Sequence, residues 1–117
     1  MRYFNIDEFD SPDIKGSGRN MDTTFLSMLD EARGIAKIPF KINSAWRSVN
    51  HNKRIGGVPG SSHLVGLAVD IHCVNSRDRF LIINALQNVG IRRIGIGNTF
   101  IHADIDTSKP HNLIWLY

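Results

Sequence analysis

At 117 residues, with 42% hydrophobic and 21% charged side chains and a formal net charge of +3, the chain is expected to form one domain over residues 1–117. It contains no apolar run near the roughly 20 residues that span a bilayer, which excludes a membrane-inserted helix. Because Cys73 is the only cysteine, an internal disulfide and a cysteine-based metal site are excluded, and a buried, unreactive thiol is expected.

The N-terminal part predicts a loop followed by a helix. Residues 9–18 are rich in turn-forming residues and are expected to form an ordered loop. Residues 22–33 predict a helix, because apolar side chains recur at helical spacing at Phe25, Leu26, Leu29 and Ala32. Asp22 or Thr23 is expected to cap its start, and Gly34 is expected to end it.

Four further elements are predicted in the middle of the chain. Residues 40–46 predict a strand with one face formed by Phe40, Ile42, Ser44 and Trp46. Residues 48–54 predict a short polar helix. Residues 67–74 predict a second strand with one face formed by Ala68, Asp70, His72 and Val74. Residues 77–89 predict the second main helix, with Ser76 as cap, Gly90 at its end and a buried stripe of Phe80, Ile83 and Leu86.

The C-terminal part predicts strands over residues 92–96, 100–106 and 113–117, joined as consecutive hairpins. In the middle strand one face carries Phe100, His102, Asp104 and Asp106, while Ile101, Ala103 and Ile105 point into the core. Strands of this kind with two main helices predict an α+β fold with a mostly antiparallel sheet.

The basic and aromatic residues do not indicate a nucleic-acid partner. Four arginines could favour an anionic surface such as a cell wall, or nucleic acid, but each is expected to lie on a solvated basic face: Arg77, Arg79, Arg92 and Arg93. Basic residues are not interleaved with aromatic ones. The core or a groove wall is expected to hold Trp46, Trp115 and Tyr117. The chain is expected to be a monomer.

His63, Asp70 and His102 are the candidate metal ligands. The first two lie seven residues apart with small residues between them that let the backbone bend, and His102 comes from a later strand. Two imidazoles and one carboxylate suit one zinc ion and leave its fourth position to water, as in catalytic sites. His72 shares a strand face with Asp70, but a spacing of about 6.6 Å along the strand places it beyond direct coordination.

Three motifs carry a resemblance to a known family. They are Ser-Ala-Trp-Arg-Ser at residues 44–48, Ser-x-His-x-x-Gly-x-Ala-x-Asp at residues 61–70 and His-Ala-Asp at residues 102–104. In this order they resemble the M15 peptidases, zinc D-alanyl-D-alanine carboxypeptidases and L-alanyl-D-glutamate endopeptidases with the Hedgehog/DD-peptidase fold. The resemblance covers residues 40–117, and the loop 10–21 and the ending 114–117 are similar to the small single-domain branch of phages and bacteria.

The resemblance implies that His63, Asp70 and His102 are the ligands of one Zn²⁺ and that Arg47 is the counterpart of an arginine of the family. A guanidinium suits bidentate capture of a carboxylate, which the stem peptides of peptidoglycan carry in quantity. Ser44 and Ser61 are expected to assist as hydrogen-bonding groups. The alternatives are a structural salt bridge for Arg47 and turn or cap hydroxyls for both serines.

The general base is a separate question, because the chain departs from the family here. Several members carry an acidic residue three positions before the last zinc histidine, where this chain has Thr99. Asp104 is the candidate base, since it lies two residues from His102 on the same predicted face. The alternative is that Asp104 orients a ligand or the substrate. Further candidates for the base are Asp106, His72 and His111.

These features predict zinc-dependent hydrolysis of a peptide bond in the peptidoglycan stem peptide, by a D-Ala-D-Ala carboxypeptidase or an L-Ala-D-Glu type endopeptidase. The alternative, which Thr99 keeps open, is a catalytically inactive, zinc-bearing module that binds cell wall or protein. The first residues are too polar for a secretory signal. The protein is therefore expected to be made in the cytoplasm and to reach the cell wall through phage lysis or delivery in a virion.

Overall fold

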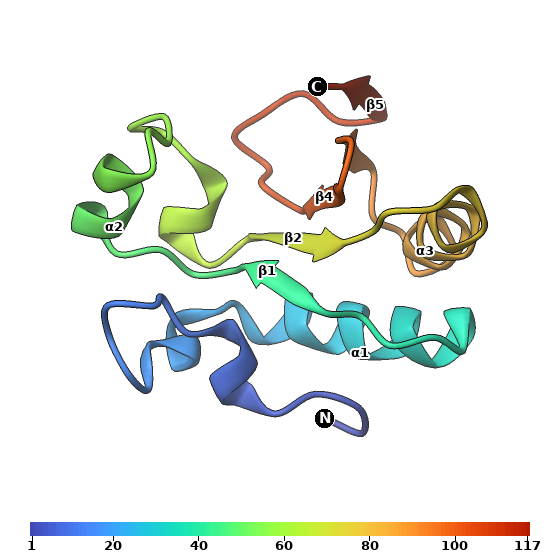
Figure 1. Cartoon of the computed structure of the whole chain (residues 1–117), viewed down its shortest axis with the longest axis horizontal. Helices are drawn as coiled ribbons and strands as arrows, with labels where there is room; N and C mark the ends of the chain where they lie inside the picture. The colour runs from blue at the N-terminus through green and yellow to red at the C-terminus, as the bar shows by residue number, and fades with distance from the viewer.

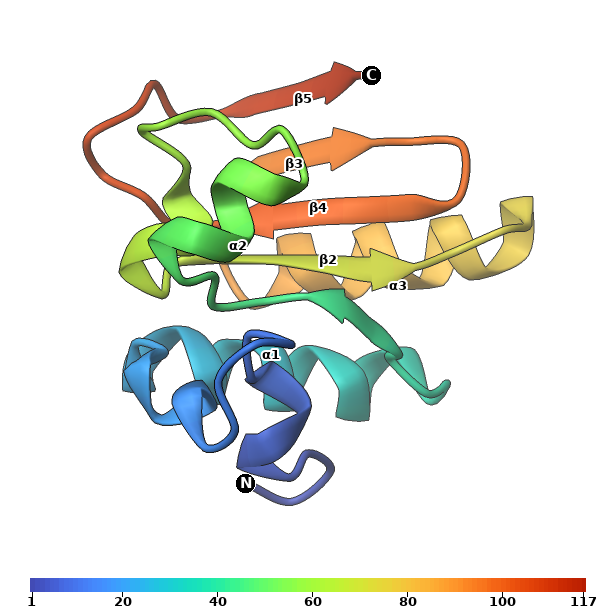
Figure 2. The same cartoon turned by 60° about the vertical axis from the view of Figure 1, so that its left-hand side comes forward.

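The computed structural model describes residues 1–117 and contains one five-stranded sheet in the order β1-β2-β4-β3-β5. The strands are β1 (Ile42–Ser44), β2 (Ala68–His72), β3 (Arg93–Ile96), β4 (Phe100–Asp104) and β5 (Leu113–Leu116). The helices are α1 (Thr23–Ala36), α2 (Val49–Arg54) and α3 (Ser76–Asn88), with short 3₁₀ turns η1 (Ile6–Phe9), η2 (Ser17–Asn20) and η3 (Ser62–Val65). The helices α1 and α3 pack against each other, and α2 lies on the opposite side of the sheet from α3 (Figure 1 and Figure 2).

Helix α1 begins where the sequence predicts and ends later. The Asp22 carboxylate accepts a hydrogen bond from the backbone N–H of Phe25 at 2.8 Å, so Asp22 is the cap. The helix continues past Gly34 to Ala36, and Lys37, which follows it, has a left-handed φ of 58°. The prediction that Gly34 ends the helix is therefore wrong. A Cβ at Gly34 would lie 2.9 Å from the Tyr3 ring, so this glycine makes room for Tyr3.

Helix α3 is capped by Asn75, whose side chain accepts from the backbone N–H of Asp78 at 2.8 Å, and not by Ser76 as predicted. Its buried face consists of Ile82, Ala85 and Leu86. The predicted stripe is wrong at Phe80, which is 69% exposed. Phe80 and Ile82 differ by two positions, or about 200° around a helix, so the two side chains project to opposite sides.

The sheet is mixed, because β5 runs parallel to β3 while the other three strand pairs are antiparallel. The predicted run of consecutive hairpins is therefore wrong at the last strand. Both edges of β4 are already occupied, by β2 and by β3. The last strand adds to the free edge of β3, and the chain reaches this edge next to the start of β3, which makes the pair parallel.

The strands are shorter than predicted, and their alternation separates the core from a polar face. Strand β1 keeps only three residues, with an irregular register between Ile42 and Ser44. The apolar face, on the side of α1 and α3, carries Ile71, Ile94 and Ile101. The same core includes Phe25, Leu29, Phe40 and Leu86. Cys73 is buried, as predicted. None of the helices is long and apolar enough to cross a membrane.

Arg93 departs from the predicted basic face. It is only 8% exposed, whereas the adjacent Arg92 is exposed. Alternation along β3 turns the two side chains to opposite faces of the sheet, and Arg93 lies on the polar face. The prediction of a solvated side chain is therefore wrong for Arg93.

Candidate metal centre

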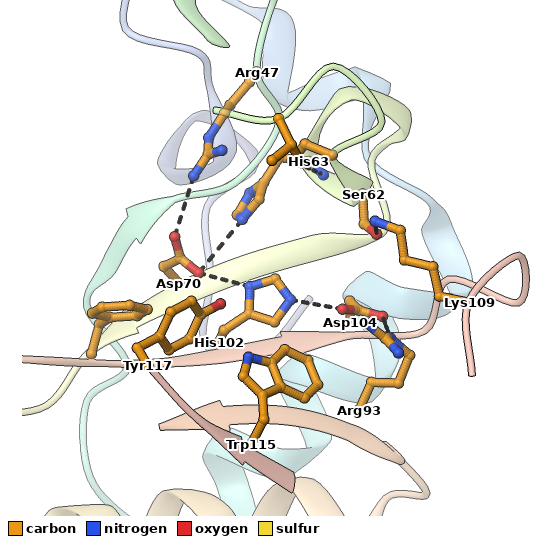
Figure 3. A pocket seen from close by; sticks show the side chains of 13 residues that line it. Arg47, Ser62, His63, Asp70, Arg93, His102, Asp104, Lys109, Trp115 and Tyr117 are labelled. Atoms are coloured by element: carbon orange, nitrogen blue, oxygen red, sulfur yellow. Dashed lines mark hydrogen bonds and ion pairs between the residues drawn. The ribbon is translucent and has the colours of Figure 1, made fainter. Parts of the chain in front are cut away.

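His63, Asp70 and His102 come together on the polar face of the sheet (Figure 3). His63 lies in η3, Asp70 in the middle of β2 and His102 in the middle of β4. Asp70 and His102 face each other directly in the register of the two strands. One ligand atom from each of the three residues lies within 4.8 Å of the others, so a single ion can contact all three.

The surroundings of His63 fix which of its nitrogens can bind a metal. Ser61 caps η3 by accepting from the backbone N–H of His63 at 3.2 Å. The ring Nδ1 lies 2.7 Å from the carbonyl oxygen of Ala45, which can only accept, so Nδ1 carries the proton. The unprotonated Nε2 faces Asp70 Oδ1 at 3.5 Å. A histidine that donates one N–H to a carbonyl and offers the other nitrogen is typical of metal ligands.

His102 is fixed in the opposite sense. Its Nε2 lies 2.7 Å from Oδ2 of Asp104, and its Nδ1 lies 2.9 Å from Oδ1 of Asp70. Burial opposes the charged imidazolium, but the hydrogen bonds to Asp104 and Asp70 outweigh it and raise the pKa of His102. A cation is therefore favoured at this point, and an ion between Nδ1 and Asp70 would supply that charge.

Asp70 completes the donor set. Burial raises its pKa, but the hydrogen bond from His102 outweighs burial, so the pKa of Asp70 lies well below its ordinary value. Oδ1 faces both imidazoles, and Oδ2 lies 3.4 Å from Nη2 of Arg47. Two neutral imidazole nitrogens and one carboxylate oxygen fit zinc with a position left open. The three side chains line a pocket of about 340 Å³.

Arg47 lines the pocket and is held by three neighbours. Its Nε donates to the Ser44 hydroxyl at 2.9 Å, Nη1 donates to Asn52 Oδ1 at 3.2 Å and Nη2 faces Asp70. Asn52 was not predicted from the sequence. The feature of the sequence that relates to its position is Gly57. A side chain there would displace Asn52, because a Cβ would lie 2.0 Å from Asn52 Oδ1. Of the two predicted serines, Ser61 lines the pocket, and Ser44 contacts Arg47 instead.

Asp104 lies beside His102 with both of its oxygens engaged. Oδ2 is bound to His102, and Oδ1 accepts from Arg93 Nε at 2.7 Å and from the Asp106 backbone N–H at 3.1 Å. Burial opposes its ionisation, but the hydrogen bond from His102 outweighs burial and lowers the pKa of Asp104. Asp104 and Asp70 are the carboxylates that line the pocket.

None of the other candidates for the base lines the pocket. Asp106 accepts a hydrogen bond from Ser62 at 2.6 Å, and His111 Nε2 contacts the Asp106 carbonyl at 3.1 Å. His72 is exposed at the end of β2 and does not line the pocket. Lys109, which was not predicted, lines the pocket beside Ser62, with Nζ 2.7 Å from the hydroxyl.

An aromatic wall borders the site next to His102 (Figure 3). Trp115 lies 5.5 Å from the His102 ring, and Tyr117 packs on Phe100 at 4.9 Å between ring centroids. Both Trp115 and Tyr117 lie over Gly95 of β3, which has no side chain to displace them. These two residues line the pocket, whereas Trp46 packs against the core.

The comparison with protein families agrees with this geometry. The model of the family described as Peptidase M15 matches residues 3–104, which include every residue of the candidate metal site. No curated protein matches the chain. Because the match covers most of the chain, the protein belongs to the Peptidase M15 family.

Proposed function

We propose that the protein is a zinc-dependent peptidase that hydrolyses a peptide bond in the stem peptide of peptidoglycan. The observation that carries the proposal is the matched pair of imidazoles: each is held by an acceptor on one nitrogen and presents the other to Asp70 Oδ1. Zinc bound there would polarise a carbonyl and lower the pKa of a coordinated water toward neutrality. Membership of a zinc peptidase family supports the same chemistry.

Arg47 is the proposed anchor for a carboxylate of the substrate. Its guanidinium lines the pocket beside Asp70, and Ser44 and Asn52 keep it in place. Asp70 partly neutralises Arg47, but a carboxylate that coordinates a metal shares its charge with the ion. An arginine fork in such a place suits a free carboxylate of the substrate. Ser44 therefore assists through Arg47, and Ser61 assists by capping the turn that holds His63.

We assign Asp104 to the orientation of His102, the second of the two roles that the sequence left open. Both oxygens accept strong hydrogen bonds from fixed donors, and the residue is 1% exposed. Asp104 therefore holds the proton on Nε2 of His102 and leaves Nδ1 free for the metal.

The substitution Asp104→Asn separates this role from general-base catalysis. An asparagine must turn its NH₂ group toward either His102 or Arg93, both of which are donors. We expect zinc affinity to fall about 10–100-fold, as for other residues that support a metal ligand. Unchanged zinc affinity with turnover reduced by about 10²–10⁴ would instead identify Asp104 as the base.

The activity is tested by the release of new amino groups from purified peptidoglycan, with zinc-loaded and chelator-treated protein side by side. Mass spectrometry of the fragments then identifies the bond and distinguishes a D-Ala-D-Ala carboxypeptidase from an L-Ala-D-Glu endopeptidase. His63→Ala should abolish release, whereas His72→Ala, outside the pocket, should not. Stoichiometric zinc binding without release from several wall types would favour the alternative, a zinc-bearing binding module.

A further inference from the structure

Arg93 is buried next to the metal centre and contacts three groups there. Its Nε donates to Asp104 Oδ1 at 2.7 Å, and its Nη1 donates to the carbonyl oxygen of Pro110. The guanidinium also stacks over Trp115, with its carbon 5.0 Å from the ring centroid. A fork that is held on three sides in this way has a single orientation.

The register of the sheet aligns Arg93 with the metal site. Arg93 faces Asp104 across the β3–β4 pair, and Asp104 lies two residues from His102 on the same face of β4. The side chains therefore form one line of hydrogen bonds, from Arg93 to Asp104 and then to His102 Nε2, each 2.7 Å long (Figure 3). The far side of the His102 ring, Nδ1, faces Asp70.

Without Arg93, Oδ1 of Asp104 would keep only the backbone N–H of Asp106, at 3.1 Å. A buried carboxylate with so few donors is costly and would turn or move toward other partners. His102 would then lose the acceptor that fixes its tautomer and its ring plane, because Asp104 is the only partner of Nε2.

We propose that Arg93 is a positioning residue of the metal centre, which acts through Asp104 to keep His102 Nδ1 directed at the metal. The proposal rests on the metal-binding role proposed above. Arg93 itself contacts neither Asp70 nor His63. Its effect on the metal must therefore pass through Asp104.

The first test is a double-mutant cycle in zinc affinity, measured by competition with a chelator of known affinity. We expect Arg93→Gln to weaken zinc binding about 10–100-fold. Since Arg93 acts through Asp104, the variant with both Arg93→Gln and Asp104→Asn should bind zinc no more weakly than Asp104→Asn alone. Arg92→Gln is the matched control and should bind zinc like the unmodified protein, because Arg92 is exposed and lies outside the pocket.

The second test reads the imidazoles directly, by ¹⁵N–¹H correlation spectra of the protein loaded with saturating zinc. His102 should carry its proton on Nε2, and Arg93→Gln should produce a mixture of tautomers at His102. His63, which is held by the Ala45 carbonyl, should keep its proton on Nδ1 in both proteins and serves as an internal control. A general loss of packing would disturb both histidines, whereas the proposed role affects His102 alone.

Arg93→Lys covers the case in which the glutamine variant does not fold. A lysine retains a hydrogen bond to Asp104 without the second arm to Pro110, so its zinc affinity should be intermediate. Unchanged zinc affinity in Arg93→Gln, or losses that multiply in the double variant, would overturn the proposal. Neither the zinc affinity nor the spectra depend on a peptide substrate. The role of Arg93 can therefore be tested whether or not the protein cleaves peptidoglycan.

Discussion

Arg47 is the residue at which substrate binding is most open to test. Lysine at this position keeps the positive charge but cannot contact Ser44, Asn52 and a substrate carboxylate together. A hydrogen bond to a charged group contributes about 1.5–3 kcal/mol, or a factor of roughly 10–100. Arg47→Lys should therefore lower kcat/KM by about that factor for a peptide with a free carboxylate beside the scissile bond.

The matched substrate for this prediction is the same peptide with that carboxylate amidated. The unmodified protein should cleave the amide more slowly, and the lysine variant should lose little further activity on it. Equal losses on both peptides would mean that Arg47 acts on the metal centre through Asp70 and not on the substrate.

Asp106 links pH to stability next to Ser62, which lines the pocket. Burial raises its pKa, but hydrogen bonds from Ser108 and Ser62 outweigh burial and lower the pKa from 3.8 to about 2. A carboxyl group with a lowered pKa in the folded state stabilises the fold above its unfolded pKa, and this contribution is lost as the pH falls through its folded pKa.

The stability that Asp106 contributes should therefore be complete above about pH 5 and disappear between about pH 4 and pH 2. The measurement is urea unfolding of the unmodified protein and of Asp106→Asn at a series of pH values. The difference in unfolding free energy between the two should shrink across this window. A constant difference would show that the pKa of Asp106 is the same in the folded and unfolded states, and it would contradict the prediction.

At the residue scale, the sequence predicted those parts of the site that lie in local motifs. Residue type and spacing selected His63, Asp70 and His102, and the resemblance to the family selected Arg47. Arg93, Asn52 and Lys109 belong to no such motif. They reach the site through strand register and loop packing, which the sequence pattern does not contain.

At the scale of elements, local periodicity predicted where helices and strands lie but not how they face or pair. The periodicity of α3 is satisfied by more than one set of apolar residues, and only packing against α1 and the sheet selects Ile82 over Phe80. The direction of β5 depends on the occupied edges of β4. Both are effects of tertiary packing. The alternation of polar and apolar side chains along β2 and β4 is local, and the sequence predicted it correctly.

Strand β3 carries a glycine that the aromatic wall requires. A Cβ on Gly95 would lie 2.6 Å from the Tyr117 ring and 2.7 Å from Trp115 Nε1. Gly95→Ala should therefore displace both rings and destabilise the fold by about 1 kcal/mol, at the low end of overpacking, because Tyr117 is 68% exposed and its ring can move. Gly60→Ala is the matched control, since no atom lies within 4 Å of its Cβ position, and it should change stability by less than about 0.5 kcal/mol. Urea unfolding measures both, and equal stabilities would contradict the packing argument.

At the scale of the whole molecule, the metal site links η3 to the paired strands β2 and β4. Its three ligands come from η3, β2 and β4, and both β2 and β4 are interior strands of the sheet. An ion that binds only the folded chain stabilises it by about 2.7 kcal/mol when its free concentration is 100 times Kd. For a domain of this size, that free energy corresponds to an increase in Tm of roughly 10 °C.

We therefore expect zinc to raise the Tm of the unmodified protein and of His72→Ala by the same amount, because His72 is exposed and lies outside the pocket. His102→Ala should lose the increase, since it removes one of only three ligands. Differential scanning calorimetry with and without zinc measures the shift. An equal shift in His102→Ala would mean that zinc stabilises the protein elsewhere, whereas a shift lost only in that variant would place the stabilising ion at the central strands β2 and β4.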